Sequence, residues 1–490
     1  MDGQSGSIRK NFNKFLAFEN EGHVLTFRYR YHNMLIWPFI RNVVWNAIYK
    51  SIYGDNAGLV DSTVQNMTKG RIFSYKWDQF FKVSKNPLFS HKQTDILYLY
   101  HVLGNVKDEN GFYYNRIYDD FVALHDSTAI IESAPLFRHF YPKKYKTFEA
   151  DSIEILCAFH EKIAILNRKD RETIDRFIAY LDSELPFEIH DPWRRIIRVE
   201  LERYAKNMKL IYSYYRKVFM NHSPKLVFVA QACDGSHMAC KIKVLRDLGI
   251  PSAEIQHGLI SDSHFAYNYS QAIYDSAEYL EYMPDFFLTF GHFWERLIRL
   301  PVKTVVLGNA NFNRNFEREY SEKTVEGSKK ISSKERNILI LPSDTESYVE
   351  LIEYIRENMP DKRLFVKVHP TKKQQYEMLK KLEDDYVGVY IKENINYFFG
   401  QTEIVIGDNS TALYEAAALG KQVIIWNTER SGSIHRAVGR WFNGKEELVE
   451  LLKTEWKDIE PEIRPEDIFA RDSKERYTEF ISKYITEMNE

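Results

Sequence analysis

Small polar side chains follow an apolar run and precede a helical one in the segment Gly407-Asp408-Asn409-Ser410-Thr411. Ser410 or Thr411 would then stand at the start of the helix, where free backbone N–H groups and the positive end of the helix dipole attract a phosphate. Asn409 or Ser410 would serve equally well as a simple N-cap. The segment therefore predicts either an anion-binding site or a structural cap.

Two further strands of the same expected sheet also end in polar side chains. The strand 364–368 runs into His369 and Pro370, and the strand 337–341 is followed by Ser343. Because proline fits the first turn of a helix, His369 would be held at the sheet edge, where its N–H could donate to a phosphate and offset the charge of a leaving group. Three polar strand ends on one edge favour a binding site over three independent caps.

A second group of polar residues follows two strands in the first half of the chain. Asp234 and the run Gln256-His257-Gly258 each lie at the end of an expected strand. If the two strands are neighbours, both groups lie on one rim, where the Asp234 carboxylate could deprotonate a hydroxyl and His257 could orient or charge-stabilise it. An Asp-Gly pair is also typical of a plain turn, and His257 could be a structural histidine. Both interpretations stay open at the level of sequence.

Short apolar or β-branched runs of strand length alternate with helix-length segments along most of the chain. We expect strands at 96–102, 129–131, 226–230, 253–256, 286–290 and 304–307, and again at 337–341, 364–368, 387–391, 404–406 and 422–426. This alternation predicts parallel sheets covered by helices on both faces. The expected fold class is α/β, with two Rossmann-like domains that face each other across a cleft.

Changes in the pattern place the expected domain boundaries. Residues 1–313 would form the first domain, with a charged helical insertion over about 151–222. Residues 314–336 are charged and serine-containing without an apolar period, which suits an exposed linker. Residues 337–490 would form the second domain and end in a helix.

Charge and cysteine content exclude several classes of protein. Lys and Arg total 67 against 69 Asp and Glu, a formal net charge of -2, so nucleic acid is not expected as a partner. The cysteines, Cys157, Cys233 and Cys240, form no C-x-x-C pair, which argues against a disulfide framework or a cysteine zinc site and favours a reducing compartment. Without an apolar stretch of about 18 residues, a cytoplasmic location is expected.

No metal and no other cofactor are expected. No strand-terminal Asp-x-Asp of the kind that holds a divalent ion on a nucleotide diphosphate is present, and Asp384-Asp385 falls in a charged helical stretch. Helix N-termini and His369 would instead stabilise a leaving phosphate.

Several short motifs, over roughly residues 225–430, resemble those of bacterial capsule and surface-polysaccharide glycosyltransferases. They are Gln256-His257-Gly258, Pro284-Asp285 with Gly291, Val306-x-Gly308-Asn309, Lys367-x-His369-Pro370, and Asp408-Asn409-Ser410-Thr411-x-x-x-Glu415-Ala416. The His-Pro step and the Ser-Thr pair also resemble bacterial sialyltransferases, capsular Kdo transferases and teichoic-acid glycerophosphotransferases, which share CMP-containing donors or leaving groups. Near the N-terminus, Trp37-Pro38-Phe39-Ile40-Arg41 is similar to a Trp-x-x-x-Arg element of the capsule enzymes.

The resemblance implies a GT-B fold, with the nucleotide donor on the second domain and the acceptor chiefly on the first. It implies donor contacts from Ser343, His369, Pro370, Asn409, Ser410 and Thr411, with Glu415 at the ribose. On the acceptor side it implies Arg41, Gln256 and Gly258. The implied catalytic residues are Asp234, His257 and His369, with Asp234 as general base or, as in some Kdo transferases, as nucleophile. Cys233 stands where the sialyltransferase group has a second acid.

The expected function is transfer of a sugar from a nucleotide-activated, CMP-linked donor to a cell-surface polysaccharide or glycolipid acceptor. The alternatives are a UDP- or GDP-sugar transferase, a nucleotide-sugar epimerase of the same fold, and a non-catalytic glycan-assembly protein. The aromatic and basic segments 27–32 and 34–41 add a further choice. They could lie at the inner membrane face beside a lipid-linked acceptor, or pack on the first domain with Arg28, Arg30 and Arg41 at the rim.

Overall fold

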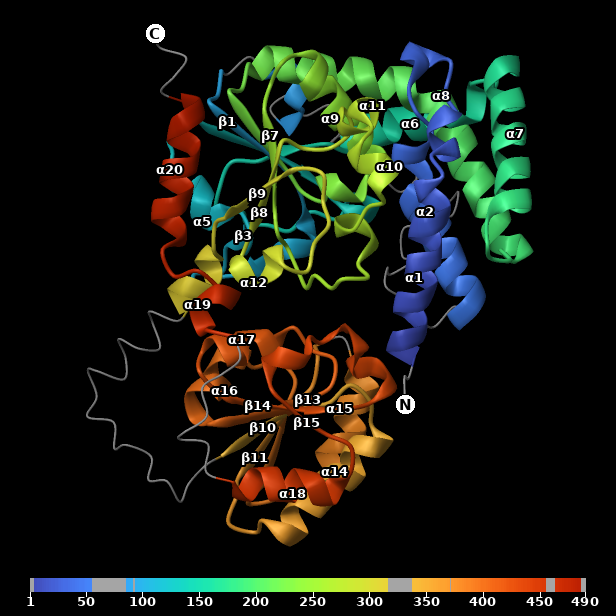
Figure 1. The fold of residues 1–490 in the computed structure, drawn as a ribbon. Helices are drawn as coiled ribbons and strands as arrows, with labels where there is room; N and C mark the ends of the chain where they lie inside the picture. The colour runs from blue at the N-terminus through green and yellow to red at the C-terminus, as the bar shows by residue number, and fades with distance from the viewer. Residues whose placement is uncertain are drawn as a thin grey trace.

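Two α/β units, drawn one above the other in Figure 1, make up the described part of the chain. The computed structural model describes residues 4–54, 85–90, 93–315, 337–370, 372–454 and 463–485. Each unit is built on a sheet in which all paired strands are parallel, with helices packed around it. The expected fold class, an α/β pair of Rossmann-like domains of the GT-B type, is confirmed.

The first sheet has seven strands in the order β5-β4-β1-β6-β7-β8-β9. They are β1 (Ile96–His101), β4 (Thr128–Ser133), β5 (Phe148–Glu149), β6 (Leu226–Val229), β7 (Ser252–Ile255), β8 (Phe286–Thr289) and β9 (Lys303–Val306). A separate antiparallel hairpin, β2 (Asn105–Lys107) and β3 (Tyr113–Asn115), follows β1. The strand order reverses between β1 and β6, and open α/β sheets bind ligands in the crevice outside such a switch point.

The second sheet has six strands in the order β12-β11-β10-β13-β14-β15. They are β10 (Ile338–Leu341), β11 (Leu364–Lys367), β12 (Val387–Tyr390), β13 (Ile404–Gly407), β14 (Gln422–Trp426) and β15 (Arg440–Phe442). Its switch point lies between β10 and β13, which pair in parallel from Ile338 to Leu341. The loops after these two strands therefore leave the sheet side by side.

Alternating side chains on β10 pack into two different hydrophobic clusters. Ile338 and Ile340 pack with Leu351 in one cluster, whereas Leu339 and Leu341 belong to the cluster that continues into the first domain. Successive side chains of a strand point to opposite faces, so both faces of β10 are buried. That burial explains its uninterrupted apolar sequence.

Helices cover both sheets. In the first unit they are α1 (Gln4–Asn20), α2 (Trp37–Tyr53), α5 (Asp119–Val122), α6 (Asp151–Ile163), α7 (Arg168–Glu184), α8 (Asp191–His222), α9 (His237–Asp247), α10 (Gln271–Tyr274), α11 (Ala277–Leu280) and α12 (His292–Glu295). In the second they are α14 (Glu346–Asn358), α15 (Lys373–Leu379), α16 (Ile395–Gln401), α17 (Ala412–Ala418) and α18 (Lys445–Lys453). The segment expected as a helical insertion is thus occupied by α6, α7 and α8, and α8 packs against both α2 and α9.

The aromatic N-terminal segment is part of the first core. Trp37, Phe39 and Ile40 are fully buried on α2, so packing on the first domain is the alternative that holds. Arg41, expected at the rim, is instead buried, because its guanidinium pairs with Glu19 of α1 at 2.5 Å. This correction leaves no part of the Trp-x-x-x-Arg element on the surface.

The C-terminal tail crosses from the second domain onto the first. It carries α19 (Pro465–Ile468) and α20 (Ser473–Ile485), and α20 lies beside the first sheet in Figure 1. Tyr477 stacks on Phe228 of β6 with ring centroids 5.8 Å apart. At Gly291 a Cβ atom would lie 2.1 Å from the Asp467 carbonyl oxygen, so only glycine lets the tail pass there.

Of the expected linker, residues 316–336 lie outside the described residues. Within the described ranges, none of the helices combines the length and the apolar character needed to cross a bilayer.

Candidate functional site

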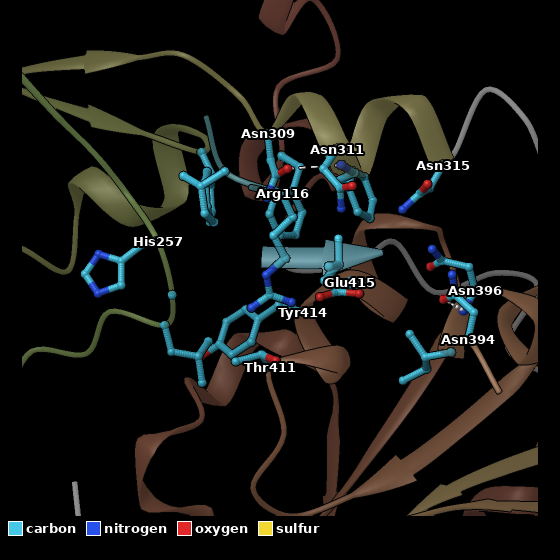
Figure 2. A pocket seen from close by; sticks show the side chains of 18 of the residues that line it. Arg116, His257, Asn309, Asn311, Asn315, Asn394, Asn396, Thr411, Tyr414 and Glu415 are labelled. Atoms are coloured by element: carbon cyan, nitrogen blue, oxygen red, sulfur yellow. Dashed lines mark hydrogen bonds between the residues drawn. The ribbon is translucent and has the colours of Figure 1, made fainter. Parts of the chain in front are cut away.

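A cavity of about 300 Å³ lies between the two domains. Its first-domain wall includes Arg116, His257, Gly258 and a group of asparagines, and Phe469 of the tail closes one side. Its second-domain wall includes Asn394, Asn396, Thr411, Tyr414 and Glu415. Figure 2 shows Arg116 of the first wall next to Thr411, Tyr414 and Glu415 of the second, with the His257 ring off to one side and directed away from them. Interdomain clefts of this size are typical binding sites for small ligands.

His257 is held in the first wall by a buried carboxylate. Its Nδ1 lies 3.6 Å from an oxygen of Glu254 and 3.3 Å from the hydroxyl of Tyr267. Tyr267 itself donates to Glu254 at 2.9 Å, which fixes both partners. Burial opposes a charge on His257, yet Glu254 and then Asp234 raise the pKa of the imidazole above its ordinary value. Glu254 therefore favours the cationic form of the ring at the cavity wall.

Asp234 stands in a strained loop next to this histidine, since β6 and β7 are neighbours. Gln231 and Ser236 both have positive φ angles, 57° and 54°. Gly235 at φ 70° lies against α2, where a Cβ atom would come within 2.3 Å of the Pro38 carbonyl oxygen. Strained backbone of this kind persists only where the surroundings enforce it, and it concentrates at functional sites.

The carboxyl group of Asp234 is poised between its two protonation states. One of its oxygens, Oδ1, is buried and finds no hydrogen-bond partner among the described residues. Burial raises the pKa of Asp234 to about 7, the negative charge of Glu254 adds to the shift, and His257 opposes it. A carboxyl group that titrates near neutrality suits a general base.

Two neighbouring hydroxyl groups on the second wall, those of Ser410 and Thr411, have different roles. Ser410 accepts a hydrogen bond from the Ala412 N–H at 3.3 Å, so the capping role falls to Ser410. Thr411 is the N-cap residue of α17 by position, makes no side-chain cap bond, and lines the cavity. The hydroxyl in the cavity is therefore that of Thr411.

Glu415 and Arg116 lie across the cavity from each other. Burial raises the pKa of Glu415 to about 7, and the positive charge of Arg116 pulls it back. Figure 2 shows the Arg116 side chain extending from the first domain toward Thr411 and Glu415. The guanidinium forms no ion pair within the described residues, so a ligand could take it as a partner.

A second buried carboxylate, Asp408, joins the loops of the second sheet edge. It accepts hydrogen bonds from Ser343 at 2.7 Å, Tyr348 at 2.9 Å and Thr428 at 2.9 Å. Asp408 is fully buried, and three hydroxyl donors satisfy its oxygens. The Ser343 hydroxyl is therefore already engaged in the protein.

The other donor residues expected from sequence lie along the same edge outside the cavity lining. His369, Pro370 and Asn409 are exposed. Partial desolvation, then Lys372 and Lys367, lower the pKa of His369, so the ring is neutral near pH 7 and offers one N–H. Lys372 ties this turn to the loop after β10 by donating to the Ser343 carbonyl at 2.6 Å.

Two expected acceptor-side residues have structural partners. Gln256 is buried, and its amide accepts from the Phe290 N–H at 2.8 Å and donates to the Gly258 carbonyl at 2.9 Å. The Arg41 guanidinium donates to the carbonyls of Phe265 and Asn268, in the loop that follows His257. Both residues hold the loop in place and neither lines the cavity.

Several residues in or directly behind the cavity wall were not predicted from the sequence. Glu254 was visible as a single acid within an otherwise buried strand. The segment 309–315 has asparagine at every second position, and three of these, Asn309, Asn311 and Asn315, line the cavity. Arg116 follows a short hairpin, and no motif or periodicity in the sequence marks it as a site residue.

One three-residue group in the described part of the chain has the composition of a metal site. It comprises His139, Glu149 and Asp151, whose ligand atoms lie within 4.8 Å of one another. Lys85 neutralises Glu149, and His139 donates to Asp151 at 2.9 Å. The group lies outside the cavity lining, and its charges are already paired within the protein.

The sequence matches no known family model and no curated protein. Among solved structures, the UDP-GlcNAc 2-epimerase from Neisseria meningitidis bound to UDP-GlcNAc is 14% identical, with a TM-score of 0.43 over 79% of this chain and 99% of that one. The wall teichoic acid polymerase TagF is 9% identical, with a TM-score of 0.44 over 91% and 99%. A glycotransferase of kitacinnamycin is 9% identical, with a TM-score of 0.35 over 80% and 96%. Similarity at this level does not bear on the activity of this chain.

Proposed function

We propose that this protein is a glycosyltransferase that takes a sugar from a nucleotide-activated donor. One observation carries the proposal: the Glu254-held His257 on the first domain and Thr411 with Glu415 on the second line one cavity. Ordered cationic and hydroxyl groups in a cleft between two Rossmann-like domains suit a phosphorylated ligand with polar substituents.

The donor would bind chiefly to the second wall. The Thr411 hydroxyl and the charge of Arg116 would contact its phosphate, with His369 contributing an N–H from the sheet edge. Glu415 would accept from a ribose hydroxyl. Neutral amides such as Asn394 and Asn396 offer both donors and acceptors, which suits the hydroxyl groups of a sugar.

The first rim would supply the chemistry. Asp234 would take the proton of the acceptor hydroxyl while that oxygen forms a bond to the anomeric carbon. The bond from the anomeric carbon to the donor phosphate oxygen breaks, and its electron pair leaves with the nucleotide. His257 and Arg116 would offset the charge that develops on the departing phosphate, without a metal ion.

The finer substrate class rests on the motif resemblance. The Lys-x-His-Pro step and the Asp-Asn-Ser-Thr run both lie at the carboxyl edge of the second sheet, next to the cavity. We therefore propose a CMP-linked donor, a cell-surface polysaccharide or glycolipid as acceptor, and action at the cytoplasmic side of the inner membrane.

The test is thermal stabilisation of the protein by CMP, CDP, UDP, GDP and their sugar conjugates in the presence of EDTA. A ligand that binds only the folded state raises apparent stability. We expect selective stabilisation by the cytidine compounds, reduced in His369→Ala and retained in His23→Ala, an exposed control.

Product analysis of the stabilising donor then separates the enzyme classes. Transfer that requires an acceptor supports the proposal, and a UDP or GDP preference would replace the donor class alone. Epimerised sugar formed without acceptor would replace the transferase by an epimerase. No response to any nucleotide would overturn the proposal in favour of a non-catalytic assembly role.

A further inference from the structure

A second polar cluster lies at the switch point of the first sheet, outside the lining of the cavity. His101 ends β1, Ser133 ends β4, and His237 begins α9. The two imidazole rings lie nearly perpendicular, with centroids 6.0 Å apart. Ser133 Oγ lies 2.5 Å from Nδ1 of His101. Residues from three separate elements thus meet where open α/β sheets bind ligands.

Lys241 stands one helical turn after His237 and brings a positive charge to this cluster. Its side chain is buried, and within the described ranges its ammonium contacts the sulfur of Met238 at 3.4 Å and the ring face of Tyr215, whose centroid is 4.9 Å away. Among the described residues, no carboxylate lies within ion-pair distance of it. Burial lowers the pKa of Lys241 to about 8 and Glu154 opposes the shift, so the side chain is mostly charged at pH 7. A buried ammonium without an oxygen partner is costly, and an oxyanion would offset that cost.

The charge states of the residues around Lys241 also suit an anionic ligand. Burial and then Lys241 lower the pKa of His101 to about 4. Partial desolvation and then Lys241 lower the pKa of His237, the more exposed of the two rings. Both rings are neutral near pH 7, and each can donate one N–H. Burial raises the pKa of Glu154, the acid facing Lys241 from α6, to about 7, so this carboxyl group only partly offsets the ammonium.

We propose that Lys241, His101 and His237 bind an oxyanion, the phosphate or carboxylate group of the acceptor. The lysine supplies the charge, and the two imidazoles supply directed N–H donors. The site lies beside the reacting rim, because His237 follows the Asp234 loop by three residues. Assignment of the oxyanion to the acceptor rests on the proposed transferase function, whereas the binding site itself does not.

The site is tested without donor or turnover, by the rate at which diethyl pyrocarbonate modifies each histidine. The reagent attacks neutral imidazoles, and peptide mass spectrometry reads His101, His237 and the exposed control His23 separately. The probes are glucose 1-phosphate, glucuronate and glucose at equal ionic strength. We expect an oxyanion probe at twice its Kd to slow modification of His101 and His237 about threefold, with His23 unchanged.

Two lysine variants on one helix make the test specific. Lys241→Met removes the charge but keeps the length of the side chain, and it should abolish protection. Lys243→Met changes a partly buried lysine paired with Asp247 and Glu281, and it should retain protection. Lys241→Arg keeps the charge and should also retain protection, which covers the case in which the methionine variant does not fold.

The pattern of protection among the three probes identifies the ligand or excludes the site. Protection by glucose 1-phosphate alone identifies a phosphate ligand, and protection by glucuronate alone identifies a uronate. No protection by either oxyanion, equal protection by neutral glucose, or full protection in a folded Lys241→Met variant would overturn the site. Because no nucleotide is present, a failed donor assignment in the thermal experiment would leave these results unaffected.

Discussion

The two domains each place one buried carboxylate beneath the rim that faces the other domain, and the two carboxylates have different partners. Glu254, under the first rim, contacts the titratable side chain of His257 at 3.6 Å. Asp408, under the second rim, accepts from Ser343, Tyr348 and Thr428, all hydroxyl groups. The first carboxylate therefore sets a charge in the cleft, whereas the second only fixes the shape of a loop edge.

This difference assigns different work to the two rims. Around Glu254 the pKa values of Asp234 and His257 are both raised, as is typical of residues that transfer or stabilise protons. The rim above Asp408 offers chiefly hydroxyl and amide groups, and its titratable cavity residue, Glu415, stands by itself instead of being coupled to a histidine. In this account the first rim carries the chemistry and the second holds the donor.

The largest expected effect comes from Asp234→Asn. The amide keeps the shape of the side chain but cannot accept the acceptor proton, so kcat should fall by about 10³-fold. Donor affinity, measured by calorimetry, should stay at its wild-type value. Transfer at near wild-type rate in this variant would show that Asp234 is not the base, and the two rims would then no longer differ in catalytic role.

A smaller loss should follow from Glu254→Gln. Removing the buried negative charge lowers the pKa of His257, so a smaller fraction of the imidazole is cationic at a given pH. We expect kcat to fall by about 30-fold, with the loss partly recovered at lower pH as the imidazole becomes protonated again. Tyr267→Phe, which removes one hydrogen bond and no charge, is the matched control.

The counterpart in the second domain, Asp408→Asn, should act on stability. The three hydroxyl donors lose a charged acceptor, and the free energy of unfolding should fall by about 2 kcal/mol in urea denaturation. The folded variant should retain most of its kcat. A collapse of kcat at unchanged stability would show that the second rim takes part in catalysis.

The pH dependence follows from the raised pKa of Asp234, about 7. A base must be ionised, so kcat/KM should rise about fivefold from pH 6 to pH 7 and about tenfold from pH 6 to pH 8, where it levels off. Because the folded-state pKa exceeds the ordinary value, the contribution of Asp234 to stability falls as pH rises from about 4 to about 7. Asp234→Asn should abolish both trends, and a rate profile flat across this range would exclude Asp234 as the base.

The smallest effect is expected from Thr411→Val. Only one hydroxyl is lost, and it is the one that the structure leaves without a cap bond in the cavity. The donor Kd should rise about fivefold, or about 1 kcal/mol, at unchanged kcat. Ser410→Ala changes the neighbouring capping hydroxyl and should alter donor binding less. A larger increase in donor Kd in Ser410→Ala than in Thr411→Val would assign the donor contact to Ser410.

Much of the fold could be predicted because buried parallel strands are apolar along their whole length. Each strand expected from an apolar run is present, as for β10 and β13. The missed strands are short or lie at edges, such as β5 with two residues and β15 with three, and no period can be recognised over such lengths. The hairpin that presents Arg116 was missed for the same reason.

The candidate site was only partly accessible from sequence. Four residues selected from the sequence line the cavity: His257, Gly258, Thr411 and Glu415. They could be selected because strand ends and helix starts can be located by pattern. The role of Glu254 depends on Tyr267 and His257, which fold back over it. The surroundings of Lys241 include Tyr215 of α8 and Glu154 of α6, which are distant in the sequence. Such tertiary contacts leave no periodic trace in the chain.

The division of labour between the rims is tested most directly by a double-mutant cycle of Asp234→Asn and Thr411→Val, with donor Kd and kcat measured for all four proteins. The account predicts that the kcat loss follows Asp234 alone and the Kd increase follows Thr411 alone, so that the double variant shows both changes unaltered. A rise in donor Kd in Asp234→Asn as large as that in Thr411→Val, or an equal loss of kcat in Thr411→Val, would contradict it.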